Sequence, residues 1–117
     1  MDLKTESHEN TLWVHLDEPR LDAAVALRFK DNMRDICLPH YHRIMLDMSA
    51  VTFLDSSGLG ALVAVMKSLS KDQTLELAAP SFNVSKVLRL TRMDTVFTIH
   101  ATLADARAAG GFDAVQS

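Results

Sequence analysis

Alternating apolar and polar residues mark the first clear element of the chain, a strand over residues 11–17. Its apolar positions fall on every second residue, which is typical of a strand with one buried face. They are Leu12, Val14 and Leu16. The polar residues 2–7 can pair with this strand as a hairpin, with residues 8–10 as the turn. The alternation breaks around Pro19, so we expect the strand to end before that residue.

A helical pattern follows over residues 22–36. Its apolar positions are three or four residues apart and therefore share one face of a helix. They are Ala26, Phe29, Met33 and Ile36. Asp22 is a residue type that caps helix starts, and Pro39 ends the region. We interpret Cys37 as a small apolar residue that closes this helix, with a reactive thiol as the alternative.

Residues 42–48 contain three apolar residues in a row, at positions 44–46, which favours a central strand covered on both faces. After a short turn, a second helical pattern begins near Ser56 or Ser57. Its apolar stripe has helical spacing. The stripe consists of Leu59, Leu62, Val63, Met66 and Leu69.

The second half of the chain continues the alternation of strands and helices. The expected elements are a strand over residues 74–78, a helix capped by Ser81 or Asn83, a strand over 95–100 and a helix over 102–109. This order predicts a single α/β domain with a mixed sheet of four to five strands and about four helices. Gly110 and Gly111 would end the last helix, so we place the domain at residues 1–110 and a C-terminal tail at 111–117.

Composition and charge limit the partners and the cellular location that we expect for such a domain. The chain has 117 residues, 48% of them hydrophobic, so it can bury a core without a metal or a disulfide. Its net charge of −3 gives no electrostatic reason to expect nucleic acid or a membrane as a partner. Residues 1–6 are polar, the apolar run 59–66 is too short to cross a bilayer, and Cys37 is the single cysteine. We therefore expect a cytoplasmic protein. Because the sequence shows no evident exposed apolar stripe, we expect a monomer when the protein is free.

The segment Asp55-Ser56-Ser57-Gly58 combines residue types that carry chemistry at a helix start. Such a start leaves backbone N–H groups without partners and carries a partial positive charge, and one serine can cap it. The other hydroxyl would then face outward, where phosphorylation would add about 1.5–2 negative charges beside Asp55. The alternative is that both serines are ordinary helix caps. Gly58 and Gly60 would let another surface approach closely.

Other kinds of site fit the sequence less well. The segment is no hydrolase nucleophile elbow, because Leu54 stands where that motif needs glycine, and no Gly-Lys-Ser or Gly-Lys-Thr phosphate loop occurs. Nucleotide binding at the helix start stays open. His40 and His42 would share one strand face, but no further ligand stands at a matching spacing. We therefore expect no metal and no cofactor, and without an acid–base pair around a nucleophile we expect no enzyme.

Basic residues on the first and third predicted helices are interspersed with acids. Solvated helix faces explain them, and contact with an acidic partner is the alternative. These residues are Arg28, Lys30, Arg34, Lys86, Arg89 and Arg92.

The block Asp55-Ser56-Ser57-Gly58-Leu59-Gly60 follows an apolar strand and the pair Phe53-Leu54. In this setting it resembles the signature of STAS domains, and specifically of the bacterial anti-sigma-factor antagonists. The resemblance extends to the pair Leu21-Asp22 and to the order of elements over nearly the whole chain.

This resemblance implies a binding protein. In the family, the antagonist binds an anti-sigma factor that is also a serine kinase, and thereby frees the sigma factor. The kinase phosphorylates the serine directly after the motif aspartate, which is Ser56 here, and a serine phosphatase reverses the reaction. By the same likeness the partner-binding surface would consist of Asp22, Asp55, Ser56, Ser57, Gly58 and Leu59.

Two loops depart from the family pattern. Many relatives carry glycine two residues before the Leu-Asp pair, where this chain has Pro19, and many have glycine where residues 70–73 stand. Both departures leave the expected fold intact and bear on which partner docks. The alternative function is a STAS subunit of another assembly, such as a lipid-transport complex, a stressosome-like assembly or a regulator of secretion or motility.

Overall fold

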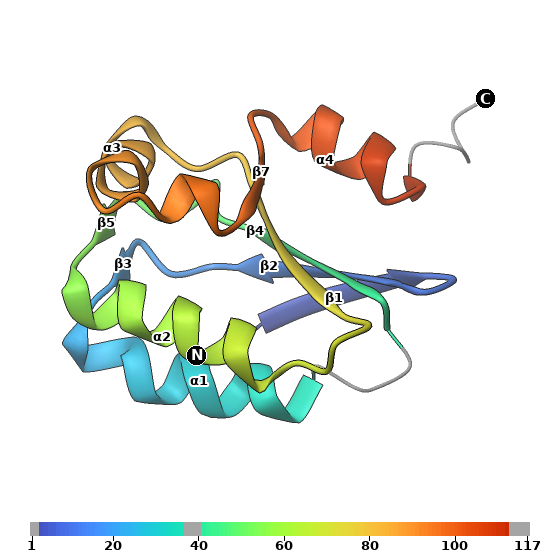
Figure 1. Ribbon diagram of the computed structural model, residues 1–117, viewed down its shortest axis with the longest axis horizontal. Coiled ribbons are helices and arrows are strands. Elements are labelled where there is room, and N and C mark those ends of the chain that lie inside the picture. Colours follow the sequence, from blue (N-terminus) through green and yellow to red (C-terminus); the bar gives the residue numbers. More distant parts are fainter. Residues whose placement is uncertain (1–2, 37–40, 113–117) are drawn as a thin grey trace.

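A computed structural model describes residues 3–36 and 41–112, which form one α/β domain (Figure 1). The strands are β1 (Leu3–His8), β2 (Thr11–Leu16), β3 (Arg20–Leu21), β4 (Arg43–Asp47), β5 (Phe53–Leu54), β6 (Thr74–Ala78) and β7 (Thr98–His100). The helices are α1 (Ala23–Ile36), α2 (Ser56–Ser68), α3 (Phe82–Leu90), α4 (Leu103–Ala109) and the short 3-10 helix η1 (Met93–Thr95). The predictions for Cys37 and His40 fall outside the described residues.

Five strands form the main sheet in the order β1-β2-β4-β6-β7. β1 and β2 pair antiparallel, and the other neighbours pair in parallel, so the predicted mixed sheet with four α-helices is confirmed. A second sheet of two short parallel strands joins β3 to β5 and places Leu21 beside Leu54. The sequence predicted neither of these strands. They lie at the end of the molecule where α1 and α2 begin (Figure 1).

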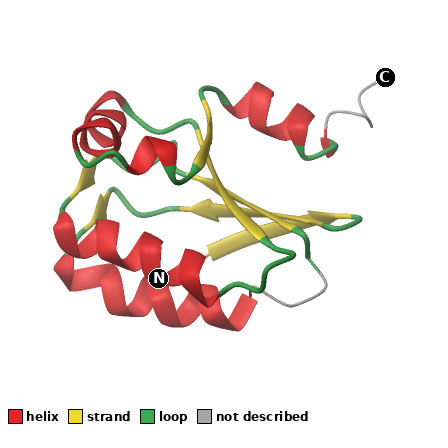
Figure 2. Ribbon diagram, viewed as in Figure 1, coloured by secondary structure: helices red, strands yellow, loops and turns green. Residues whose placement is uncertain are grey.

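α1 and α2 lie side by side on one face of the main sheet (Figure 2). The alternation in β2 is confirmed, because Leu12, Val14 and Leu16 are buried in the core under these helices. The predicted stripe of α1 is confirmed at Phe29 and Met33, which are fully buried. On α2 the predicted stripe is confirmed at Leu62, which is buried, and its other members are partly buried against the core. The side chains of Ala61 and Val65 are buried as well.

α4 packs on the opposite face of the sheet, over a smaller apolar cluster. The cluster contains Trp13, Met45, Ala78, Ala106 and Phe112. The ring of Phe112 meets that of Trp13 edge-on, with 5.9 Å between the ring centroids. Phe112 belongs to the stretch that the sequence assigned to a loose tail, and it is instead buried at 5% exposure. The domain boundary at residue 110 stays a prediction.

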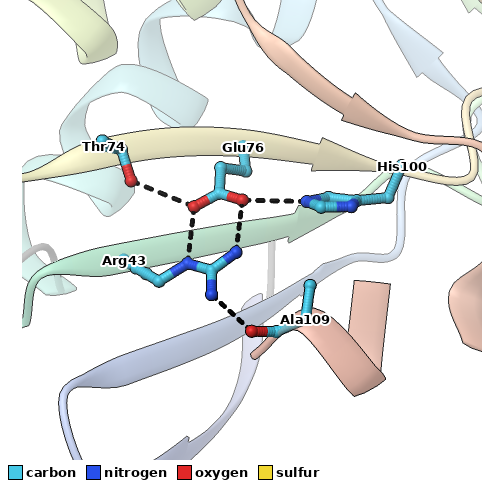
Figure 3. A network of polar contacts seen from close by, with 5 residues as sticks. All are labelled: Arg43, Thr74, Glu76, His100 and Ala109. Carbon is cyan, nitrogen blue, oxygen red and sulfur yellow. Dashed lines mark hydrogen bonds and ion pairs between the residues drawn. The ribbon is translucent and has the colours of Figure 1, made fainter. Parts of the chain in front are cut away.

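A polar network ties α4 to the sheet (Figure 3). Nε and Nη2 of Arg43 donate to the two carboxylate oxygens of Glu76 at 2.8 and 2.7 Å, and Nη1 donates to the carbonyl of Ala109 at the end of α4. His100 Nε2 lies 2.8 Å from Glu76, and Thr74 donates to the same carboxylate. Burial alone would raise the pKa of Glu76, but hydrogen bonds from Arg43 and His100 outweigh it and lower the pKa to about 2.

The remaining elements differ from the predictions mainly at their ends. β6 has the predicted bounds, and Ser81 caps α3 by accepting from Val84 N at 3.3 Å. The last strand is shorter than the predicted 95–100, because η1 occupies the residues before it. A left-handed backbone at Arg92, with φ of 64°, starts this tight turn.

Candidate functional site

The start of α2 is held in place by the two-stranded sheet. The backbone N–H groups of Thr52 and Phe53 both donate to the carbonyl of Pro19, at 2.8 and 3.2 Å. Asp55 N donates to the carbonyl of Leu21 at 3.4 Å. Because Pro19 contributes a carbonyl and needs no N–H here, proline fits this position where the family pattern has glycine. The segment around β3 and the segment before α2 therefore form one end of the molecule.

Asp55, and neither serine, is the N-cap of α2. Its Oδ1 accepts from Gly58 N at 2.9 Å, and its carbonyl accepts from Leu59 N, the first bond of the helix. The prediction that one serine caps the helix is therefore wrong. The helix starts at Ser56 as expected, so the cap belongs to the residue before it, and a carboxylate serves this position as well as a hydroxyl does.

Ser56 and Ser57 consequently occupy the first turn of α2, and neither hydroxyl serves as its cap. Both residues are exposed, and neither side chain makes a hydrogen bond within residues 3–36 and 41–112. An enzyme can reach either hydroxyl without opening the fold. A phosphate at this position would meet the positive end of the helix, which favours negative charge.

Gly58 serves the packing inside the domain. It is buried, and a Cβ at this position would lie 2.0 Å from the carbonyl oxygen of Leu21 and 2.9 Å from a side-chain carbon of Leu54. Only glycine lets α2 start this close to β3. The surface that approaches Gly58 is thus part of the same chain, and Leu59 beside it is half-buried against the core.

Asp22 lies at the start of α1, beside an aromatic–arginine pair that sequence reasoning missed. Asp22 accepts from Ala24 N at 3.1 Å, as a helix cap does, and also from Arg20 Nε at 3.2 Å. The Arg20 guanidinium stacks over the Phe53 ring at 4.0 Å from its centroid. Both residues are exposed. They belong to two-residue strands, which are too short to show a sequence pattern.

The histidines inside the described residues have partners within the fold. His15 Nδ1 lies 2.8 Å from Asp47 on the neighbouring strand, His42 Nδ1 lies 3.3 Å from the carbonyl of Asp72, and His8 stacks obliquely on Phe112. No group of three or more potential metal ligands comes together in residues 3–36 and 41–112. Within the same residues, no helix is both long and apolar enough to cross a membrane.

A capped helix start with two exposed hydroxyls, tied to a loop that carries Asp22, suits reversible modification and docking. The sequence was also compared with models of known families. A model described as "STAS domain" matches residues 2–106. The chain belongs to the STAS domain family. The match covers both parts of the site described above, the Asp22 loop and the start of α2.

Relatives of this STAS domain include proteins named as anti-sigma factor antagonists. A protein of Thermotoga maritima, whose name places it among the anti-sigma factor antagonists, is 36% identical over 67 residues, which cover 56% of this chain. The aligned part spans 59% of that relative. The crystal structure of an anti-sigma factor antagonist from Mycobacterium paratuberculosis superimposes with a TM-score of 0.81 at 25% identity, over 94% of this chain and 93% of its own.

More distant structures share the fold alone. The anti-sigma factor antagonist SpoIIAA in its unphosphorylated form is 21% identical, with a TM-score of 0.70 over 98% of this chain and 96% of its own. SpoIIAA of Bacillus in its phosphorylated form gives a TM-score of 0.66, also at 21% identity, over 92% and 98% of the two chains. A sulfate transporter family protein of Wolinella succinogenes reaches 0.74 at 20% identity, over 92% and 89%.

Proposed function

We propose that this STAS domain is an anti-sigma-factor antagonist whose partner binding is switched off by phosphorylation of Ser56. The partner is an anti-sigma factor that is also a serine kinase, and a serine phosphatase restores the active form. The surface for the partner is the end of the molecule that carries Asp22, Asp55, Ser56, Ser57, Gly58 and Leu59. Catalysis belongs to the partner, and this chain supplies the substrate hydroxyl.

The single observation that carries the proposal is the exposed hydroxyl of Ser56 in the first turn of α2, which makes no hydrogen bond within the described part of the chain. Because Asp55 caps the helix, modification of Ser56 removes no hydrogen bond of the fold. A phosphate would add about 1.5–2 negative charges next to Asp55, and a docked partner would meet both repulsion and the desolvation of that charge. The switch therefore acts on the complex and leaves the domain folded.

Names of relatives support the same function. The Thermotoga maritima and Mycobacterium paratuberculosis proteins are both designated anti-sigma factor antagonists. SpoIIAA, which has the same fold, exists in an unphosphorylated and a phosphorylated form.

The test compares Ser56→Ala with Ser56→Asp. Each variant is immobilised and exposed to extract of the cells that make the protein, and the kinase-type protein retained by Ser56→Ala is purified for equilibrium binding. Ser56→Asp should bind it at least tenfold more weakly than Ser56→Ala, because the aspartate carries part of the phosphate charge. Ser70→Asp, which adds the same charge beyond the far end of α2, should bind like the unmodified protein. Equal affinities of the two Ser56 variants would contradict the proposal.

The same experiment addresses the second candidate, a STAS subunit of another assembly. The fold similarity to a sulfate transporter family protein is the observation that favours it. In that case the retained partner would be a subunit of a membrane complex, and the charge at Ser56 would not alter its retention.

A further inference from the structure

A groove runs between the outward sides of α1 and α2. It consists of two adjoining hollows of about 380 and 290 Å³, which share Leu27 and Lys30 of α1. The larger hollow lies at the start of α2, and the smaller one extends toward the end of that helix. We call this feature the α1–α2 groove and define it by Leu27, Lys30 and Arg34 of α1 with Ser57, Gly60 and Ala64 of α2.

Gly60 is the residue whose presence the fold does not explain. A Cβ at this position would meet no atom within 4 Å, whereas a Cβ at Gly58 would collide with Leu21. Glycine inside a helix lowers its stability relative to alanine, because it loses more backbone freedom on folding. Packing of this chain therefore requires glycine at position 58 and gains nothing from it at position 60. The open space above Gly60 is part of the larger hollow.

The groove has an apolar centre and an α1 wall whose charged side chains sum to +1. Leu27 lies between the two hollows and is 64% exposed, although it is a large apolar side chain. Lys30 forms no ion pair within the described residues, and Arg34 pairs with Asp31. The charged lining residues are thus two cations and one anion, on a chain whose net charge is −3. An occupant with apolar and acidic side chains complements this wall.

We propose that the α1–α2 groove binds an acidic amphipathic helix of the anti-sigma factor, with its apolar side chains over Gly60 and Leu27 and its carboxylates at Lys30. The identity of the partner rests on the proposed function. A helix fits because a groove between two adjacent helices accepts the side-chain ridge of a third. From Ser57 to Ser68 the floor is about 16 Å long, which equals about three turns of the bound helix.

The α1–α2 groove begins next to Ser56, the proposed phosphorylation site. Ser57 lines the larger hollow, and Ser56 directly precedes it at the same helix start. A phosphate on Ser56 would therefore stand at one end of a groove that holds an acidic helix, and like charges would repel. The rest of the groove keeps its complementarity, so the two contributions can be separated by mutation.

The first arm of the test uses two synthetic 14-residue helical peptides with the same leucine face, one carrying glutamate on its polar face and the other lysine. Each is titrated into the full ¹⁵N-labelled chain while backbone amide chemical shifts are followed. The glutamate peptide should shift the amides of Leu27, Gly60 and Ala64 and bind at least fivefold more tightly than the lysine peptide. Equal binding of the two peptides, shifts elsewhere, or no shifts would overturn the groove as a docking site.

The second arm uses variants that change the groove and spare the fold. Gly60→Phe fills the larger hollow and should weaken glutamate-peptide binding at least tenfold, with an otherwise unchanged amide spectrum. The double variant Lys30→Glu, Arg34→Glu should reverse the preference between the two peptides. Unaltered binding by Gly60→Phe, or an unaltered preference in the double variant, would overturn the proposal.

The third arm separates this inference from the proposed function. The purified anti-sigma factor is titrated with Gly60→Phe, Ser56→Ala and Ser56→Asp. If Ser56→Asp alone weakens binding, the groove is overturned and the switch stands. If both Gly60→Phe and Ser56→Asp weaken it, both proposals are supported. If the two Ser56 variants bind equally, the proposed function fails, whatever the peptides show.

Discussion

Asp55, Ser56 and Ser57 have different roles at the start of α2. The carboxylate of Asp55 caps the helix through Gly58 N, and this leaves Ser56 and Ser57 exposed with unbonded hydroxyls. If a serine were the cap, one hydroxyl would both cap the helix and accept the phosphoryl group. With aspartate in that place, stability and modification depend on different side chains. A charge added at Ser56 would therefore leave the cap in place.

We predict that Asp55→Ala lowers the free energy of unfolding by about 1 kcal/mol, because the first turn of α2 loses its cap. Asp55→Asn should retain most of the stability, since an amide oxygen can accept the same bond. Urea unfolding at pH 7 measures both. If Asp55→Ala unfolds at the same urea concentration as the unmodified protein, the cap contributes nothing and the division of roles described above is wrong.

The sequence predicted long elements well and short ones poorly. Periodicity over seven or more positions identified β2, α1 and α2, since a repeated pattern averages out single exceptions. β3 and β5 have two residues each and show no period, so the sequence did not predict that Arg20 stacks on Phe53. In a helix-start segment where aspartate and two serines are consecutive, every one of them is a suitable cap type. Only the backbone decides between them.

The sequence also did not predict contacts between residues that are far apart in the chain. Phe112 looked like part of a tail because its partner Trp13 stands about a hundred residues earlier in the chain. The link between Glu76 and Arg43 depends on the parallel pairing of β4 with β6. Local patterns carry no information about such pairs.

The two glycines of α2 give a matched prediction for the helix. Gly58→Ala should destabilise the domain by about 1–3 kcal/mol, because its Cβ would overlap the carbonyl oxygen of Leu21. Gly60→Ala should stabilise it by about 0.5–1 kcal/mol, because the added Cβ meets open space and the helix gains propensity. Thermal and urea unfolding of the two variants should therefore move in opposite directions. A loss of stability in Gly60→Ala would mean that this glycine serves the fold after all.

At the scale of the whole molecule, the two faces of the sheet are held differently. α1 and α2 cover one face with a large apolar core. α4 covers part of the other face, where a smaller apolar cluster is joined by ionic contacts. Arg107 of α4 reaches Glu6 at 2.9 Å, and Arg43 links Glu76 to the end of the helix. Ion pairs therefore contribute to the contact of α4 with the second face, whereas the contact of α1 and α2 with the first face is an apolar core.

We predict an acid-dependent loss of stability that depends on Glu76. Its pKa is about 2 in the folded domain and 4.5 for the free carboxyl, so the unfolded chain takes up the proton first as pH falls. The stabilisation by Glu76 is thus complete above about pH 4.5 and decreases toward pH 2, by up to about 3 kcal/mol.

The measurement is the free energy of unfolding between pH 7 and pH 2 for the unmodified protein and Glu76→Gln. The variant should be less stable at pH 7, since Arg43 loses its charged partner, and its stability should change less below pH 4.5. Parallel pH profiles for the two proteins would show that other carboxyl groups cause the acid sensitivity.

The most direct test of the whole account is mass spectrometry of the protein isolated from the cells that make it, under several growth conditions. Intact masses should show a fraction with one added phosphoryl group, and fragmentation should place that group on Ser56. The fraction should vary with growth conditions, because in the proposed function a kinase adds the phosphoryl group to Ser56 and a phosphatase removes it. A phosphoryl group found only on another residue, or none under any condition, would contradict the claim that the charge at Ser56 controls partner binding.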